Sequence, residues 1–169
     1  QPVRDGSSAI PIFGITAAST SGTDQLLQIT VDFSGTGFVA GNAGTLLALS
    51  TNPATSGVAV YRDVGSVPGA LDATDTGVTA LTATWATSNV VLTFAEAFPT
   101  PAVGAFDWIL ALRTSSNAAA FAAGTQIIAT IPSGGSLFSG AVSLPASAVA
   151  ANALTASPTS LTDLIAPQG

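Results

Sequence analysis

The chain has 169 residues, 47% of them hydrophobic, so we expect one domain that is large enough to enclose a core. Charged residues make up only 7%, the net charge is −6, and the only basic side chains are Arg4, Arg62 and Arg113. Neutralising phosphates requires basic side chains, so nucleic acids and anionic membranes are excluded as partners. No apolar run reaches the length of a transmembrane helix, so we expect no membrane span in these residues.

Several residue types are missing from the chain: it contains no Met, Lys, His or Cys. A chain without an initiator Met is expected to have been processed, and removal of a signal peptide would place it outside the cell or on its surface. Disulfides stabilise many secreted domains, but a chain without Cys cannot form them. We therefore expect its stability to come from its core, from partners or from modification.

Short runs of alternating apolar and polar residues, separated by turn residues, predict β-strands along most of the chain. In the clearest run, 26–33, Leu27, Ile29, Val31 and Phe33 share one face of a half-buried strand. Further strands are predicted, in chain order, at 45–51, 57–63, 81–87, 89–96, 106–114, 125–132, 136–145 and 152–167.

The spacing of these strands predicts the architecture. The strands at 81–87 and 89–96 are expected to form a hairpin, and the one helical candidate is 115–124. Eight or nine short strands without a long helix predict an all-β protein, a two-sheet antiparallel β-sandwich of jelly-roll or immunoglobulin-like type with an extended N-terminal arm. We expect the arm to span 1–19 and a single sandwich domain to span 20–169.

The missing residue types also limit the chemistry of the chain. Without His, Cys or Lys, the catalytic arrangements Ser-His-Asp, Cys-His and Ser-Lys cannot form. The chain also lacks His and Cys, the usual protein ligands of zinc. We therefore expect no catalytic residue, no cofactor and no enzymatic activity. Asp63, Asp72 and Asp75 are candidate oxygen ligands for calcium, but we favour Asx turns in a long connection and expect no metal.

Ser and Thr must cover most of a surface that carries so few charges. One interpretation is a hydroxyl-covered β surface. The other is O-glycosylation at Ser or Thr residues that the sequence does not identify, because attached glycans would solvate the surface. The chain has no Asn-x-Ser/Thr acceptor for N-linked glycans.

The segment 7–19 places Ile10, Ile12, Phe13 and Ile15 near the chain terminus, where chains usually fray. One hypothesis is that it forms the first strand of its own sandwich. The other is that it is a donor strand that completes the sandwich of the next subunit. A head-to-tail contact of that kind does not close and propagates a filament, with a gross gain of roughly 6–12 kcal/mol from burying the four side chains.

Two residues in this segment restrict where it sits in a sheet. Pro11 has no N–H to donate, so it belongs at a sheet edge or near the start of a strand, and Gly14 indicates a bulge or a close backbone approach. The C-terminal tail, 152–167, is the other candidate for the exchanged segment.

The chain resembles secreted β-sandwich subunits of extracellular fibres, such as TasA-type biofilm-matrix proteins and the archaeal bundling pilins. The shared features are a processed chain without Met, the apolar arm "AIPIFGI", the strand opening "LLQITVDFSGTGF" and a Thr/Ser/Ala-rich domain with few charges. In that family the N-terminal strand joins neighbours by donor-strand complementation. The resemblance gives that role to Ile10, Ile12, Phe13 and Ile15, and implies an extracellular homopolymer whose partner is a further copy of itself.

The alternative function is a monomeric secreted adhesion or carbohydrate-binding β-sandwich module. Segments such as "GVAVYRD", "WILALRTS" and "IIATIP" are similar to modules of large bacterial surface proteins. Carbohydrate-binding modules present aromatic side chains on an exposed face. The candidates are Trp85, Trp108 and Tyr61; Trp108 lies in an apolar run typical of a core, which makes Trp85 the better candidate for exposure.

Overall fold

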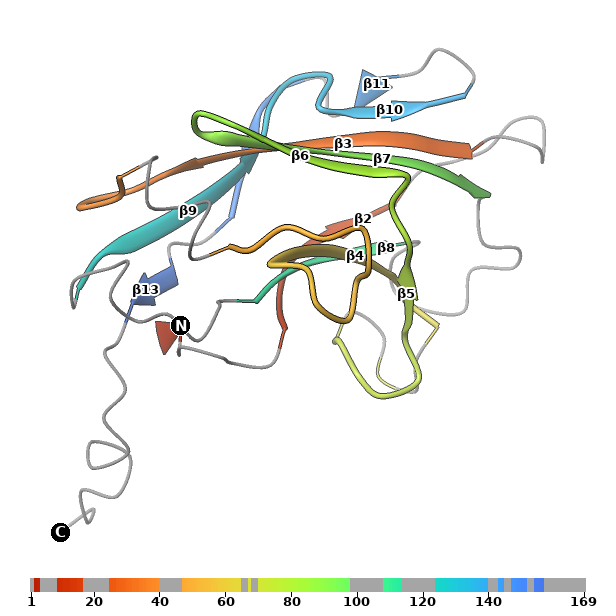
Figure 1. Ribbon diagram of the computed structural model, residues 1–169, viewed down its shortest axis with the longest axis horizontal. Helices are drawn as coiled ribbons and strands as arrows, with labels where there is room; N and C mark the ends of the chain where they lie inside the picture. Colours follow the sequence, from red (N-terminus) through yellow and green to blue (C-terminus); the bar gives the residue numbers. More distant parts are fainter. Residues whose placement is uncertain are drawn as a thin grey trace, which may run out of the picture.

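In the computed structural model, the chain is an all-β protein in which two sheets pack face to face (Figure 1). The structure describes residues 2–3, 9–16, 25–39, 47–64, 67, 70–97, 108–113, 124–139, 143–144, 147–151 and 154–156. Among them, no helix is long and apolar enough to cross a membrane. The predicted β-sandwich is confirmed, whereas the helical candidate at 115–124 lies outside the described residues except for Gly124.

The smaller sheet has four strands in the order β2-β8-β4-β5, and all its neighbours are antiparallel. Their bounds are Ile10–Ile15 for β2, Trp108–Leu112 for β8, Val58–Arg62 for β4 and Thr76–Val78 for β5. The strand β8 lies inside the sheet, and all five of its residues are buried. The strands β2 and β5 form the two edges.

The larger sheet has nine strands and is built around β3 (Gln25–Ser34). On one side, β7 (Asn89–Ala97) pairs along most of β3, and β6 (Thr82–Ala86) pairs with β7. On the other side, β9 (Gln126–Ile131) and β10 (Ser136–Phe138) pair with opposite halves of β3. The turn at 132–135 therefore connects two strands that continue one another along β3.

Four short strands extend this larger sheet. The strand β11 (Ser143–Leu144) pairs with β10, whereas β12 (Val149–Ala150) and β13 (Leu154–Ala156) pair with β9. The strand β1 (Pro2–Val3) pairs with β13, and this is the one parallel pairing among the described strands.

The core lies between the two sheets and is built mainly from apolar side chains. Trp108, Leu110 and Leu112 of β8 face it from the smaller sheet, and Ile29 and Val31 of β3 face it from the larger one. Phe33, in the same row of β3, stacks on Trp85 with ring centroids 5.7 Å apart. The strand predicted at 106–114, including its core-facing tryptophan, is therefore confirmed for the described residues.

The alternation predicted for 26–33 is correct at one end and wrong at the other. Ile29, Val31 and Phe33 are fully or almost fully buried, as the pattern indicates. At the start of the strand, however, Leu26 is buried instead of Leu27. In the pairing with β10, Gln28 and Leu26 oppose the consecutive residues Leu137 and Phe138, so β3 carries one additional residue at this point, and this bulge exchanges its two faces.

Three predicted strands are revised. The described part of 45–51 is a turn and an irregular segment, because Gly57 packs against the backbone of Leu47 and donates its N–H to Ala48 O at 2.8 Å. The run at 136–145 is divided between β10 and β11. Of the tail at 152–167, only 154–156 is described, and it forms β13.

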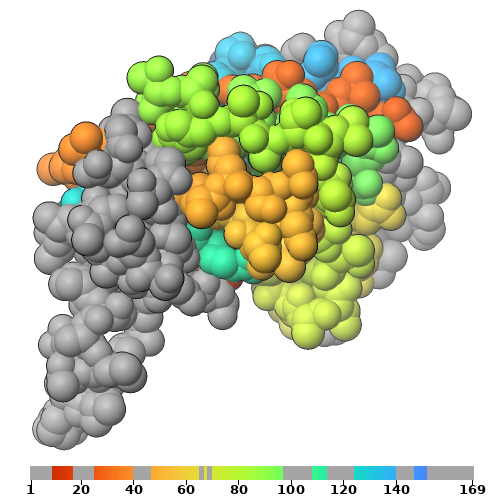
Figure 2. Space-filling model, viewed as in Figure 1, coloured from red at the N-terminus to blue at the C-terminus, as the bar shows by residue number. Residues whose placement is uncertain are grey.

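The two long sides of the sandwich are closed in different ways. On one side the chain passes directly from β5 into β6, so a covalent connection joins the two sheets (Figure 1). Arg62 of β4 and Glu96 of β7 add an ion pair between the sheets. The segment 47–57, light orange on the near face in Figure 2, lies below the green β6. On the opposite side, β2 forms the edge of the smaller sheet.

The predicted hairpin is confirmed; its turn is at Thr87 and Ser88, so its first strand ends one residue earlier than predicted. Thr87 has a φ of 50°, in the left-handed region that β-branched residues rarely adopt. We expect Thr87→Gly to raise the free energy of unfolding in urea by about 0.5–1 kcal/mol, because glycine adopts this conformation without steric cost. The control Thr84→Gly, inside β6, should lower it by about as much. A loss of stability in both variants would contradict this account of the turn.

Candidate assembly site at the β2 edge

The predicted self-assembly residues lie in β2, which pairs with β8 of the same chain. The register joins Ile10 to Leu112, Phe13 to Leu110 and Ile15 to Trp108. Residues that face each other across paired strands point to the same side of a sheet. Ile10, Phe13 and Ile15 therefore point toward the core, as their three partners on β8 do. In the single chain the segment is thus the edge strand of its own sandwich, the first of the two arrangements that the sequence allows.

A bulge in β2 explains why Ile10, Phe13 and Ile15 all face the core although they are not evenly spaced in the sequence. A regular strand would place residues 10 and 13 on opposite faces, because side chains alternate. The register shifts between Pro11 and Phe13, so Ile12 is an additional residue that has no partner of its own on β8. Pro11 lies on an edge strand, as predicted, whereas the bulge is at Ile12 and not at Gly14.

The strand β2 is less buried than β8, the strand with which it pairs. Four of its six residues are partly buried, Pro11 and Gly14 are exposed, and none is fully buried. All five residues of β8 are buried. Because Ile10, Ile12, Phe13 and Ile15 are only partly buried, each contributes less than the 1.5–3 kcal/mol expected for full burial.

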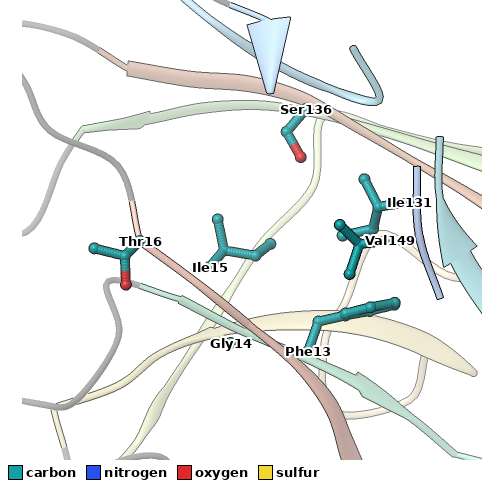
Figure 3. A pocket seen from close by; sticks show the side chains of 7 residues that line it. All are labelled: Phe13, Gly14, Ile15, Thr16, Ile131, Ser136 and Val149. Atoms are coloured by element: carbon teal, nitrogen blue, oxygen red, sulfur yellow. The ribbon is translucent and has the colours of Figure 1, made fainter. Parts of the chain in front are cut away.

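Two cavities flank β2, one on each face of the strand. The inner cavity, about 150 Å³, lies between the sheets, with Phe13 and Ile15 on one side and Ile131 and Val149 on the other (Figure 3). Thr16 and the buried Ser136 also line it, and each carries a hydroxyl group. Val149 is 46% exposed, so the lining continues to the surface.

The outer cavity, about 190 Å³, is lined by Pro11, Ile12, Phe13 and Gly14 of β2 and by Ile109 of β8. Phe13 and Gly14 line both cavities. The backbone of β2 is therefore held by its pairing with β8, whereas its side chains are incompletely packed on either face.

The other candidate residues do not form a metal site in the described part of the chain. No group of three or more His, Cys, Asp or Glu is placed to hold a metal there. Asp75 accepts the N–H groups of Val64 and Asp72, at 3.1 and 2.8 Å. Asp72 accepts the N–H of Thr74 at 2.8 Å, and Asp63 is only 2% exposed. The contact of Asp72 with Thr74, two residues on, is an Asx turn of the kind that the sequence favoured, whereas the two contacts of Asp75 join more distant parts of the same connection.

The aromatic candidates for carbohydrate binding are not displayed on the surface. Trp108 is in the core. Trp85 is partly buried and stacks on Phe33, and Tyr61 is partly buried and donates its hydroxyl hydrogen to Pro53 O at 3.0 Å. Both tryptophans and the only tyrosine of the chain thus have structural contacts.

Sequence reasoning found the strand of this site but missed its surroundings. Ile131 was predicted within a strand, but no local pattern indicates that it faces β2 across the sandwich. Val149 lies in a two-residue strand, which is too short for an alternating pattern to be detected. Comparisons with protein-family models, with curated proteins and with solved structures found no match to this chain.

Gly14 offers a direct test of the packing around β2. It pairs with Ile109, lines the outer cavity and is not among the glycines with positive φ. We expect Gly14→Val to raise the free energy of unfolding by about 0.5–1 kcal/mol, because valine fills space beside Ile109 and favours a strand.

Gly57→Val is the matched control, because a Cβ at this position would lie 2.5 Å from the carbonyl carbon of Leu47. We expect this control to lower the free energy of unfolding. If Gly14→Val also lowered it, the outer cavity would not be available to a side chain, and the description of β2 as loosely packed would be wrong.

Proposed function

We propose that this chain is a structural subunit of an extracellular filament. In the filament, β2 of one subunit takes the place beside β8 of the next that it holds here within its own chain. The observation that carries the proposal is the contrast between the two strands: β8 is fully buried, whereas the edge strand that covers it is half-buried and flanked by two cavities.

The strand β8 requires an edge partner from some source. Without β2, one side of β8 would present unpaired N–H and C=O groups, and its core-facing side chains Trp108, Leu110 and Leu112 would lose their cover. An unpaired edge of this kind is a template for a strand from another chain. A conformation that releases β2 is therefore short-lived unless another strand replaces it.

The strand β2 is suited to exchange, because it is held in place by a backbone ladder and by side chains that are only partly buried. Such a ladder forms equally well with β8 of a second copy, and the same side chains would meet the same core. The two arrangements share their strand contacts, so subunit concentration and the additional contact between subunits set the balance. A donor strand that leaves its own domain makes a head-to-tail contact, which propagates as a filament.

The surface chemistry supports an extracellular subunit that carries O-linked glycans. Thr82 and Thr84 are exposed on β6, at the edge of the larger sheet, and Thr82 Oγ1 lies 2.7 Å from Thr93 Oγ1 of β7. These hydroxyls are accessible acceptors on a surface with few charges. Intact mass spectrometry of the native protein tests this part: we expect a mass above the 16.5 kDa of the bare chain, and a mass equal to it would remove glycosylation from the proposal.

Truncation tests the role of the arm in assembly. We expect the native protein to form fibres in negative-stain electron microscopy and the chain lacking residues 1–18 to form none, because the donor strand is gone. If the native protein and the truncated chain were both folded, soluble monomers, the filament proposal would be contradicted and the monomeric adhesion module would be favoured.

Cysteine pairs show which chain supplies the strand, and they do not depend on the truncated chain folding. The chain has no Cys, and Pro11 pairs with Ala111 across β2 and β8. A mixture of single variants, Pro11→Cys and Ala111→Cys, should give disulfide-linked dimers when assembled and oxidised. The double variant should give a ladder of covalent multimers on a non-reducing gel. Fibres whose double variant forms only a disulfide within each chain would contradict strand exchange.

A further inference from the structure

The N-terminal arm contacts both sheets of the sandwich. Its strand β2 belongs to the smaller sheet through β8, whereas β1, separated from β2 by six residues, belongs to the larger sheet through β13. The strands β1 and β13 pair in parallel, with Pro2 opposite Thr155 and Val3 opposite Ala156. The N-terminal arm is therefore paired, through β1, with the C-terminal tail that is the other candidate for exchange.

The short connection between β1 and β2 couples their positions. An extended chain advances at most about 3.6 Å per residue, so the seven steps from Val3 to Ile10 span at most about 25 Å. A compact domain of this length has a radius of gyration of about 15 Å, and therefore a diameter of roughly 40 Å. If β1 stayed on its own β13 while β2 reached a neighbour, the neighbour's β8 would have to lie within that short span.

We propose, on the premise that the chain assembles by strand exchange, that β1 and β2 are exchanged as one unit. The acceptor surface of the second copy then has two parts: β8, which receives β2, and β13, which receives β1. The arm of one subunit completes both sheets of the next. The described part of the C-terminal tail, β13, is thereby an acceptor and not a donor.

The pairing of β13 supports this role. The strand pairs with β9 through Leu154 and Thr155, so it remains attached to its own sheet when β1 leaves. Its other side then presents backbone groups at the edge of the larger sheet. The departure of the arm would thus leave one edge of β8 and one edge of β13 unpaired at the same time. The distance between these two edges already matches the arm, so the identical arm of another copy can pair with both.

A second cysteine pair tests this inference separately from the proposed function. Residues paired on neighbouring strands have Cα atoms about 5 Å apart, within the range that a disulfide spans. The double variant Val3→Cys/Ala156→Cys reports on β1 and β13, and the double variant Pro11→Cys/Ala111→Cys reports on β2 and β8. Each variant is assembled, oxidised, and separated on non-reducing and reducing gels, and circular dichroism confirms that it is folded.

We expect both variants to give the same ladder of covalent multimers, which reduction collapses to single chains. A ladder from the β2 pair alone, with the β1 pair closed within each chain or left reduced, would overturn the exchange of the arm as a unit and leave the proposed function standing. A ladder from the β1 pair alone would also overturn the unit. No ladder from either pair in fibres would overturn both proposals.

Discussion

The antiparallel ladder between β2 and β8 is the contact on which the rest of the sandwich depends. The strand β8 carries Trp108, Leu110 and Leu112 into the centre of the core, and its own position is fixed by neighbours on both sides. One neighbour, β4, is an internal strand of the sheet. The other, β2, lies close to the start of the chain and is, among the described strands, the only one that pairs with that side of β8.

The two sides of the sandwich differ because the chain closes one of them covalently. The direct passage from β5 to β6, supported by the ion pair of Arg62 with Glu96, ties the sheets together on that side. On the other side the edge is supplied by a segment that reaches back from the terminus and meets the sheet through a backbone ladder and half-buried side chains. Strand exchange would therefore take place at the side where the edge strand is only half-buried and lies close to the chain terminus.

Local patterns in the sequence predicted the elements that are long and regularly alternating. The runs that became β3, the β6–β7 hairpin and β8 are examples, because each contains enough alternating or apolar residues for one face to be identified. The candidate residues Ile10, Ile12, Phe13 and Ile15 were found for the same reason: a cluster of large apolar side chains near a terminus requires cover. The fold class follows from these elements and the absence of helical periodicity.

The details that local patterns missed depend on tertiary contacts. The bulges at Ile12 and near Leu26 reverse the expected faces, and each is set by the register with a partner distant in the sequence. The segment 47–51 has the composition of a strand, but the close approach of Leu47 to Gly57 holds it in a turn. The pairing of β1 with β13 joins two- and three-residue strands from opposite ends of the chain, which no local signal indicates.

The most direct test of this account is whether β8 accepts a strand from a separate molecule. A synthetic peptide of residues 7–19 is titrated into the chain that lacks residues 1–18, while near-ultraviolet circular dichroism follows the environments of the aromatic side chains, which include Trp108 in the core. We expect one peptide to bind per chain and to restore the dichroism of the intact protein, with a peptide carrying Phe13→Asp and Ile15→Asp as the inactive control. The account would be contradicted by a truncated chain that is already folded and does not bind the peptide, or by one that stays unfolded when the peptide is added.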